Sequence, residues 1–418
     1  MRRTLMCIPA LLLAAACGGE AGSSAGWAGT VEDSAGVQLV KNTLTPVWGE
    51  GEAWVLEDVM TIGEAAGDPD YQFGQISGIV VTTDGRIILV DQQAQHVKVF
   101  GPDGSYERTI GQGGSGPGEF GPGVGPILIG RGDTLIVPDL GNQRVNILRS
   151  DGSEPASFRM SFDQGIPARW DVTEAGDLVY QLRALNLPNT EQRDTLDLIA
   201  TVSYAGEIID TLMTPKRGES LTFGDDGQPI RMIFSPEPVW ALIGDDGLCF
   251  AVNDVFRLSM YDAGGNLDRI VTLPLERKPV TDADIESFMQ TVDRLLNEQG
   301  VPPEQAELVK STFNFADYFP AFLQMMPGPK GSLWVQRVQE PTGMTAEERE
   351  AWNPLLDLGA SEWDILDAEG RYLGVLDMPH RFQPVTFEGD LMYGIWRDEF
   401  DVQYVRVMKI TGMGENSA

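Results

Sequence analysis

Three arginines stand at equivalent places in the sequence, each at the end of a short β-prone run. They are Arg183, Arg337 and Arg397. Guanidinium groups bind carboxylates and phosphates through paired hydrogen bonds, so three of them on one face of a fold could hold an anionic ligand. Trp396, beside Arg397, would add a stacking surface. The alternative is that each arginine pairs with a neighbouring acidic side chain, for example Arg397 with Asp398 or Glu399.

A second set of side chains could bind a hard cation instead. Carboxylate and amide oxygens are the ligands that Ca²⁺ takes. Such groups follow other β-prone runs, at Asp91, Asp139, Asn253 and Asp254. Their alternative role is local, because an Asp at the end of a strand often accepts hydrogen bonds from the backbone of its own turn.

The sequence contains few residues or motifs that could support other kinds of catalysis. The only histidines are His96 and His380, and two isolated imidazoles do not make a zinc site. The chain has no P-loop, no HExxH motif and no GxSxG elbow. We therefore predict no catalytic residue and no cofactor, with Ca²⁺ as the ion to consider if the acidic set binds a cation.

A repeat supplies the elements that position these residues. Residues 73–111 and 120–162 each contain four β-prone runs separated by Gly turns and a polar corner, at a period of about 45 residues, which is typical of propeller blades. Turn spacing indicates six such units, the last of which lacks its fourth strand. Residues 53–62 could supply that strand. We predict an all-β, six-bladed β-propeller over residues 51–412, closed by an N-terminal strand that joins the last blade.

Parts of the repeat resemble a known family. Gly78-Ile79-Val80, Ile88-Leu89-Val90-Asp91, Val97-Lys98-Val99-Phe100 and Gly116-Pro117-Gly118-Glu119-Phe120 are similar to NHL repeats. With the leader described next, the chain resembles uncharacterised bacterial lipoproteins that carry a six-bladed NHL- or TolB-like propeller. NHL propellers bind proteins or RNA, and related six-bladed folds include lactonases and lyases. The resemblance implies an architecture and leaves the function to be argued from a site.

The N-terminus has the pattern of an export signal. Arg2 and Arg3 precede an apolar run that ends in small residues at Cys17, which resembles the lipobox of bacterial lipoproteins. We predict a lipoprotein signal peptide over residues 1–17 with lipidation at Cys17, and a flexible tether and N-terminal extension over 18–50. The protein would then be anchored to a bacterial membrane by lipid alone, in the periplasm or at the cell surface. The alternative is an ordinary secretory signal.

The charge of the chain limits its partners. It has 62 acidic and 30 basic residues and a formal net charge of −32. Such a surface repels phosphates, so we expect no nucleic acid partner, and we expect a soluble, acidic monomer. Cys249 lies in an apolar run and is expected to be a buried free thiol.

The surplus residues of the later repeats fall in loops that should emerge together. Strands of a blade alternate in direction, so second-to-third loops and blade-to-blade connections share one face. The long segments are of these two kinds, namely 183–197, 215–231, 277–316 and 340–360. Helical spacing predicts a helical insertion at about 281–315, which could be a lid, a partner-binding element or a plug of the channel, and residues 413–418 form a tail.

Together these features predict a membrane-tethered, extracytoplasmic binding module without catalytic activity. Its partner would be a protein, a peptide or a small anionic ligand, bound on the face that carries the insertions. The alternative is a cation-dependent lactonase, another hydrolase or a lyase that uses the propeller channel.

Overall fold

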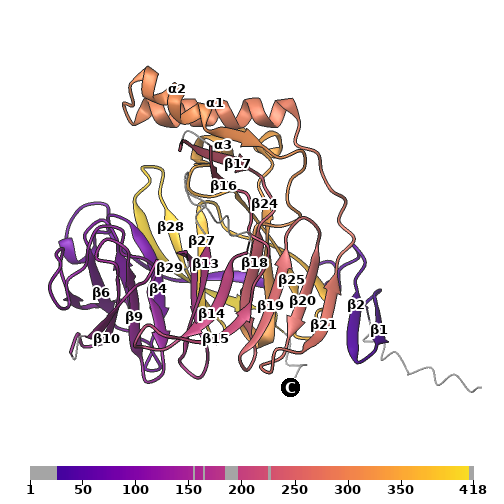
Figure 1. The fold of residues 1–418 in the computed structure, drawn as a ribbon, viewed down its shortest axis with the longest axis horizontal. Coiled ribbons are helices and arrows are strands. Elements are labelled where there is room, and N and C mark those ends of the chain that lie inside the picture. Colours follow the sequence, from indigo (N-terminus) through magenta and orange to yellow (C-terminus); the bar gives the residue numbers. More distant parts are fainter. Residues whose placement is uncertain (1–25, 154–155, 163–164, 184–195, 225–226, 414–418) are drawn as a thin grey trace, which may run out of the picture.

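Six antiparallel sheets surround a central axis in the computed structural model of the chain (Figure 1). The structure describes residues 26–413 except 154–155, 163–164, 184–195 and 225–226. The leader with Cys17, most of the 183–197 loop and most of the tail lie outside the described residues. The predicted six-bladed β-propeller is confirmed.

Each blade has four main strands, numbered outward from the axis in five of the six cases. Blades one to three comprise β4 (Ile76–Val81), β5 (Ile87–Asp91), β6 (His96–Phe100) and β7 (Tyr106–Ile110); β8 (Leu128–Gly130), β9 (Thr134–Asp139), β10 (Arg144–Arg149) and β11 (Ala156–Arg159); and β12 (Ile166–Val172), β13 (Leu178–Arg183), β14 (Leu198–Val202) and β15 (Ile208–Met213). Blades four and five comprise β18 (Pro238–Ile243), β19 (Gly247–Val252), β20 (Arg257–Tyr261) and β21 (Leu267–Thr272); and β23 (Gln324–Pro327), β24 (Leu333–Val338), β25 (Gly359–Leu366) and β26 (Tyr372–Asp377).

The sixth blade joins the two ends of the chain, as predicted. β27 (Phe382–Glu388), β28 (Leu391–Arg397) and β29 (Gln403–Thr411) come from the C-terminal region, and β3 (Val55–Ile62) is the outer strand. β3 and β29 pair antiparallel from Val55 opposite Thr411 to Ile62 opposite Val405. This pairing removes the open sheet edges that a linear array of blades would present.

An N-terminal hairpin extends blade four, and the sequence did not reveal it. β1 (Thr30–Ser34) pairs with β2 (Val37–Lys41), and β2 runs parallel to β21, which makes a six-stranded sheet. The chain then follows blade five, where the amides of Val47 and Trp48 donate to the carbonyls of Tyr372 and Leu373. Residues 27–62, here called the N-terminal belt, therefore tie blades four, five and six together along their outer edges.

The second strand of each blade forms the centre of the core. Ile88, Leu89 and Val90 of β5 have no exposed surface, because strands flank β5 on both sides and neighbouring blades cover both of its faces. Such a strand is continuously apolar and does not alternate. The same position in blade four holds Cys249, which is also fully buried.

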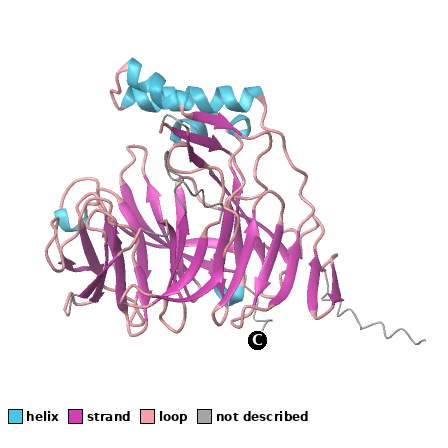
Figure 2. Cartoon of the chain, viewed as in Figure 1, coloured by secondary structure: helices cyan, strands magenta, loops and turns pink. Residues whose placement is uncertain are grey.

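A separate structure, here called the cap, lies on one face of the propeller, and Figures 1 and 2 show its helices and short strands above the blades. It comprises β16 (Leu221–Phe223), β17 (Pro229–Ile233), α1 (Asp282–Glu298), α2 (Pro303–Ser311), β22 (Phe313–Phe315), η3 (Pro341–Gly343) and α3 (Ala346–Ala351). The predicted helical insertion is confirmed, with Thr281 and Asp284 forming its capping box. The small sheet of β16, β17 and β22 is a further element that the sequence did not reveal.

The cap has a hydrophobic core of its own. Phe288 of α1 packs edge-on against Phe313, Phe315 and Trp352, with ring centroids 5.2 to 5.9 Å apart. Asp284 also accepts hydrogen bonds from the amide and hydroxyl of Thr342, which fixes α1 to η3. The three long segments that build the cap are therefore packed as one unit.

We expect Cys249 to be inert in the folded protein. Burial raises the pKa of its thiol from its ordinary value of 9.0 to about 12, so roughly a thousandfold less thiolate forms than in an exposed cysteine. Labelling with a maleimide, mapped to Cys249 by mass spectrometry, should fail in buffer and succeed in concentrated urea. Rapid labelling of the native protein at this residue would contradict the packing of β19.

Candidate binding site beneath the cap

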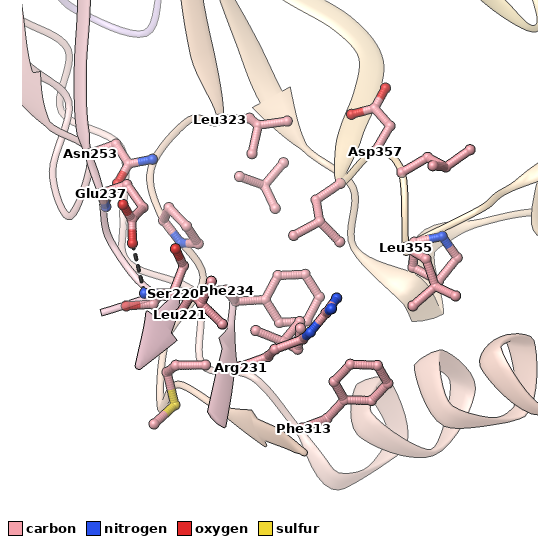
Figure 3. Close-up of a pocket in the computed structure, with 18 residues that line it drawn as sticks. Ser220, Leu221, Arg231, Phe234, Glu237, Asn253, Phe313, Leu323, Leu355 and Asp357 are labelled. Carbon is pink, nitrogen blue, oxygen red and sulfur yellow. Dashed lines mark hydrogen bonds between the residues drawn. The ribbon is translucent and has the colours of Figure 1, made fainter. Parts of the chain in front are cut away.

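A cavity of about 450 Å³ lies between the cap and the rim of blades four and five (Figure 3). Its walls come from β17, from the connections on either side of blade four and from the loop that leads into β25. The lining residues are Ser220, Leu221, Arg231, Met232, Ile233, Phe234, Ser235, Glu237, Asn253, Phe313, Pro320, Leu323, Val338, Pro354, Leu355, Leu356, Asp357 and Leu358.

Most of this wall is apolar. Phe234 contacts Phe319 with their ring centroids 4.6 Å apart, which holds the Phe234 ring beside the cavity. Leu323 lies on the propeller side, and Phe313 and Leu355 lie on the cap side (Figure 3). Leu356 remains 68% exposed, an unusual state for a leucine between packed elements. The site can therefore accept an apolar group without rearranging its core.

Arg231 is the cationic group of the cavity. Its backbone is fixed by β17, where its amide donates to the carbonyl of Thr312 at 2.8 Å. Its side chain is exposed and extends into the cavity between Phe234 and Phe313 (Figure 3). Among the residues that the structure describes, no carboxylate forms an ion pair with its guanidinium. The signal in the sequence was an arginine inside an apolar run, Pro229-Ile230-Arg231-Met232-Ile233, which belongs to no blade.

Arg183, one of the predicted anion-binding residues, forms ion pairs with two acidic side chains at the edge of this site. Its Nη2 lies 2.5 Å from Oε2 of Glu237, and its Nε lies 3.5 Å from Oδ2 of Asp197. The other oxygen of Glu237 accepts the amide of Ser220 at 2.8 Å. Arg183 thus links the end of β13 to the beginning of blade four and to the cap.

Arg337 is also paired. Its Nε and Nη2 contact the two carboxylate oxygens of the buried Asp364 at 3.1 and 2.8 Å, and Glu362 lies 3.4 Å away. Burial opposes the charge of the guanidinium, but the hydrogen bonds and the charge of Asp364 outweigh it, so the pKa of Arg337 is raised.

Arg397 and Trp396 are placed apart from both. Arg397 lies 3.7 Å from Asp401, which takes the role that we assigned to Asp398. Trp396 packs on Tyr404 at 5.2 Å and lies under the guanidinium of Arg406 at 5.6 Å. The structure therefore does not bring the three predicted arginines together in one mouth, and each has an acidic neighbour.

Three of the four predicted cation ligands share a structural role. Asp91 accepts the amide of Gly74 at 2.8 Å, Asp139 accepts that of Gly121 at 3.0 Å, and Asn253 accepts that of Glu237 at 2.7 Å. In each case a side chain at the end of the second strand holds the backbone that leads into the first strand of the same blade. We call this repeated arrangement the rim clasp.

The fourth of these residues, Asp254, lines a different cavity, next to Leu275 and Arg337. Within the described ranges, no group of three or more His, Cys, Asp or Glu side chains is arranged to hold a metal ion. The two histidines of the chain are also separate: His96 begins β6 of blade one, and His380 lies in the connection between blades five and six.

A second cavity of about 280 Å³ adjoins the first and shares Leu356 and Asp357 with it. His380, Glu348 and Arg397 are among its polar lining residues. Burial raises the pKa of Asp357, although the amide of Gly359, 2.7 Å from its Oδ1, and the charge of Arg397 act in the opposite direction. Asp357 is the carboxylate that both cavities have in common.

Comparison with known proteins supports the architecture. A family model described as a 6-bladed β-propeller matches residues 68–131, which span blade one and the beginning of blade two. No curated protein sequence matches the chain. In the described part of the chain, no helix has both the length and the apolar character needed to cross a membrane.

Solved structures with the same architecture are distant in sequence. A protein from Bacteroides fragilis, named for its expected export, has 11% identity and a TM-score of 0.51, over 89% of this chain and 99% of that one. Virginiamycin B lyase from Staphylococcus aureus has 12% identity and a TM-score of 0.40, over 85% and 99%. The calcium-binding protein regucalcin from Agrobacterium tumefaciens has 8% identity and a TM-score of 0.41, over 85% and 95%. At these identities the similarity shows the fold alone.

The rim clasp should contribute measurably to stability. Asp139→Ala leaves the amides of Gly121 and Asn142 without their acceptor and should lower the free energy of unfolding by about 1–3 kcal/mol. Asp139→Asn, which keeps one acceptor, should lose less. Urea denaturation measures both against Asp268→Ala, an exposed control. A loss that appears only when Ca²⁺ is present would instead indicate a cation ligand.

Asp357 should make stability depend on pH in a defined direction. Its folded-state pKa is raised above its ordinary value of 3.8, so its ionisation favours the unfolded state as pH rises through the interval between the ordinary and the folded-state values. Asp357→Asn removes this penalty while Gly359 keeps an acceptor. The variant should be more stable than the wild type at pH 8, and the difference in thermal midpoint should shrink towards pH 4. A difference independent of pH, as expected for the exposed control Asp268→Asn, would contradict the shift.

Proposed function

We propose that the protein is a binding module whose cap cavity takes a small organic anion with an apolar body, such as a medium-chain or aromatic carboxylate. The observation that carries this proposal is Arg231, whose guanidinium forms no ion pair with a described carboxylate and extends into a mostly apolar cavity that Glu237 and Asp357 also line. In a chain with 62 acidic and 30 basic residues, such a cation is expected to be paired unless a ligand supplies the negative charge.

The dimensions and chemistry of the cavity fit this class of ligand. Its volume of about 450 Å³ lies in the range of small-molecule sites, which are mostly apolar with a few polar groups that fix orientation. The hydrocarbon part of the ligand would lie against Phe234, Phe313 and Leu323. Its carboxylate would accept two hydrogen bonds from Arg231. The same geometry suits the C-terminal residue of a peptide, if its side chain is apolar.

The cap would act as a lid for such a ligand, because its residues form one side of the cavity and the rigid propeller forms the other. Among the described residues that line the cavity in the central channel, none belongs to α1 or α2, which supports a lid over a plug. In this proposal the chain is exported and held at a membrane through acylated Cys17. The basic start and the apolar run before Cys17 support that part of the proposal.

The proposal is tested with decanoate as the ligand and decanol as its uncharged analogue. A charged hydrogen-bonded pair contributes about 1.5–3 kcal/mol, so Arg231→Met should weaken decanoate binding roughly ten- to hundredfold in isothermal titration calorimetry. Arg257→Met is the matched control, because Arg257 is also exposed and lines none of the cavities described above. It should change the affinity less than twofold.

Two further outcomes bear on the proposal. Decanol should bind the wild type and Arg231→Met equally, since it lacks the carboxylate. Binding of decanoate should be the same in EDTA and in Ca²⁺, because in this proposal the guanidinium of Arg231 binds the carboxylate and no metal ion takes part. Equal decanoate affinity in the two arginine variants, or binding that requires Ca²⁺, would overturn the proposal.

A further inference from the structure

The central channel contains a further cavity, of about 630 Å³, which is larger than the cavity beneath the cap. The first strands of five blades line it, namely β4, β8, β12, β23 and β27. Gly389 and Lys330, which belong to tight turns between first and second strands, also line it. The cavity therefore reaches the face of the propeller opposite to the cap.

Arg169 of β12 crosses this channel. A β-bulge between Pro167 and Arg169 interrupts the pairing of β12 with β13, and bulges re-aim the side chains beside them. The guanidinium of Arg169 lies 5.0 Å above the ring of Trp240 in blade four. Its Nη2 donates to the carbonyl of Met325 in blade five at 3.3 Å. One side chain thus extends from blade three past blade four to blade five.

The charge of Arg169 is only partly compensated. A guanidinium has five N–H donors, and a single hydrogen bond to a carbonyl is found here. Among the described residues, no carboxylate lies within ion-pair distance, although Asp171 acts on it through space. Burial lowers the pKa of Arg169 and raises the pKa of Asp171, because it disfavours the charged form of both side chains. A bound molecule with complementary charge would offset this effect on both.

Arg169 and Asp171 also have a spacing that suits one small molecule. They are two residues apart on the same strand and therefore lie on the same side of it, about 7 Å apart along the chain. Both line the channel cavity. Trp240, beneath the guanidinium, limits how far Arg169 can turn away. The pair presents a cation and a carboxylate next to each other in a confined space.

We propose that the channel is a binding site for a small carboxylate that carries a hydrogen-bond donor next to its carboxyl group, as α-hydroxy and α-amino acids do. The ligand carboxylate would accept hydrogen bonds from Arg169, and its hydroxyl or ammonium group would donate to Asp171. This site lies on the opposite side of the propeller from the cap cavity and shares no lining residue with it. Its test is therefore independent of the function proposed for the cap.

The test uses L-lactate, L-alanine and propionate as probes, because propionate has the carboxylate of both acids without the adjacent donor. Isothermal titration calorimetry of the full protein should show saturable binding of L-lactate or L-alanine, and at least tenfold weaker binding of propionate. Which of the two acids binds distinguishes a hydroxyl from an ammonium donor. Failure of both to bind, or equal binding of propionate, would overturn the proposal.

Variants assign the effect to the two residues. Arg169→Gln should weaken binding of the preferred acid at least tenfold, and Arg231→Met, in the cap cavity, should leave it unchanged. Asp171→Asn should reduce the discrimination against propionate to less than threefold. Because Arg169→Gln changes a buried contact with Trp240, circular dichroism must first show that it folds. If it does not fold, Asp171→Asn alone decides, and unchanged discrimination in that variant would refute the site.

Discussion

The pairing of β3 with β29 is the constraint on which the rest of the structure depends. Neighbouring blades pack face to face, so an unclosed array could open at its two ends and leave two bare sheet edges. The pairing from Val55–Thr411 to Ile62–Val405 fixes the circumference. A fixed circumference sets the distance across the channel, which Arg169 spans from blade three to blade five. It also holds the rim on which the cap rests.

Local hydrogen bonds position the rim of the propeller, and a close backbone approach at a glycine positions the channel wall. The rim clasp repeats in blades one, two and four, with two aspartates and one asparagine serving the same backbone position. In the channel wall, a Cβ on Gly78 would lie 2.7 Å from the amide nitrogen of Ile127, closer than real contacts allow. Only glycine lets β4 and β8 approach so closely. These contacts fix the backbone of the rim and of the channel wall, on which the two cavities depend.

The blades and α1 could be predicted from the sequence because the features that specify them involve residues close together in the chain. These features are the Gly turns, the apolar second strands and the Thr281–Asp284 capping box. Elements that depend on distant partners were not predictable in this way. β1 is exposed along its whole length, and β17 pairs in parallel with β22 across a long insertion. Likewise, we predicted that Arg337 could bind a ligand because its partner, Asp364, is not close to it in the sequence. Asp364 lies in the next strand of the sheet. No pattern in the sequence indicated a role for Arg169, because a β-bulge determines the direction of its side chain.

The N-terminal belt has a consequence for the order in which the molecule can form. β2 pairs with β21, residues 47–48 bond to β26, and β3 pairs with β29, so these early segments have partners that are synthesised more than 200 residues later. Contacts of such long sequence separation form slowly. The ring therefore cannot close before residues 405–411 have been synthesised, and until then β3 lacks the strand with which it pairs.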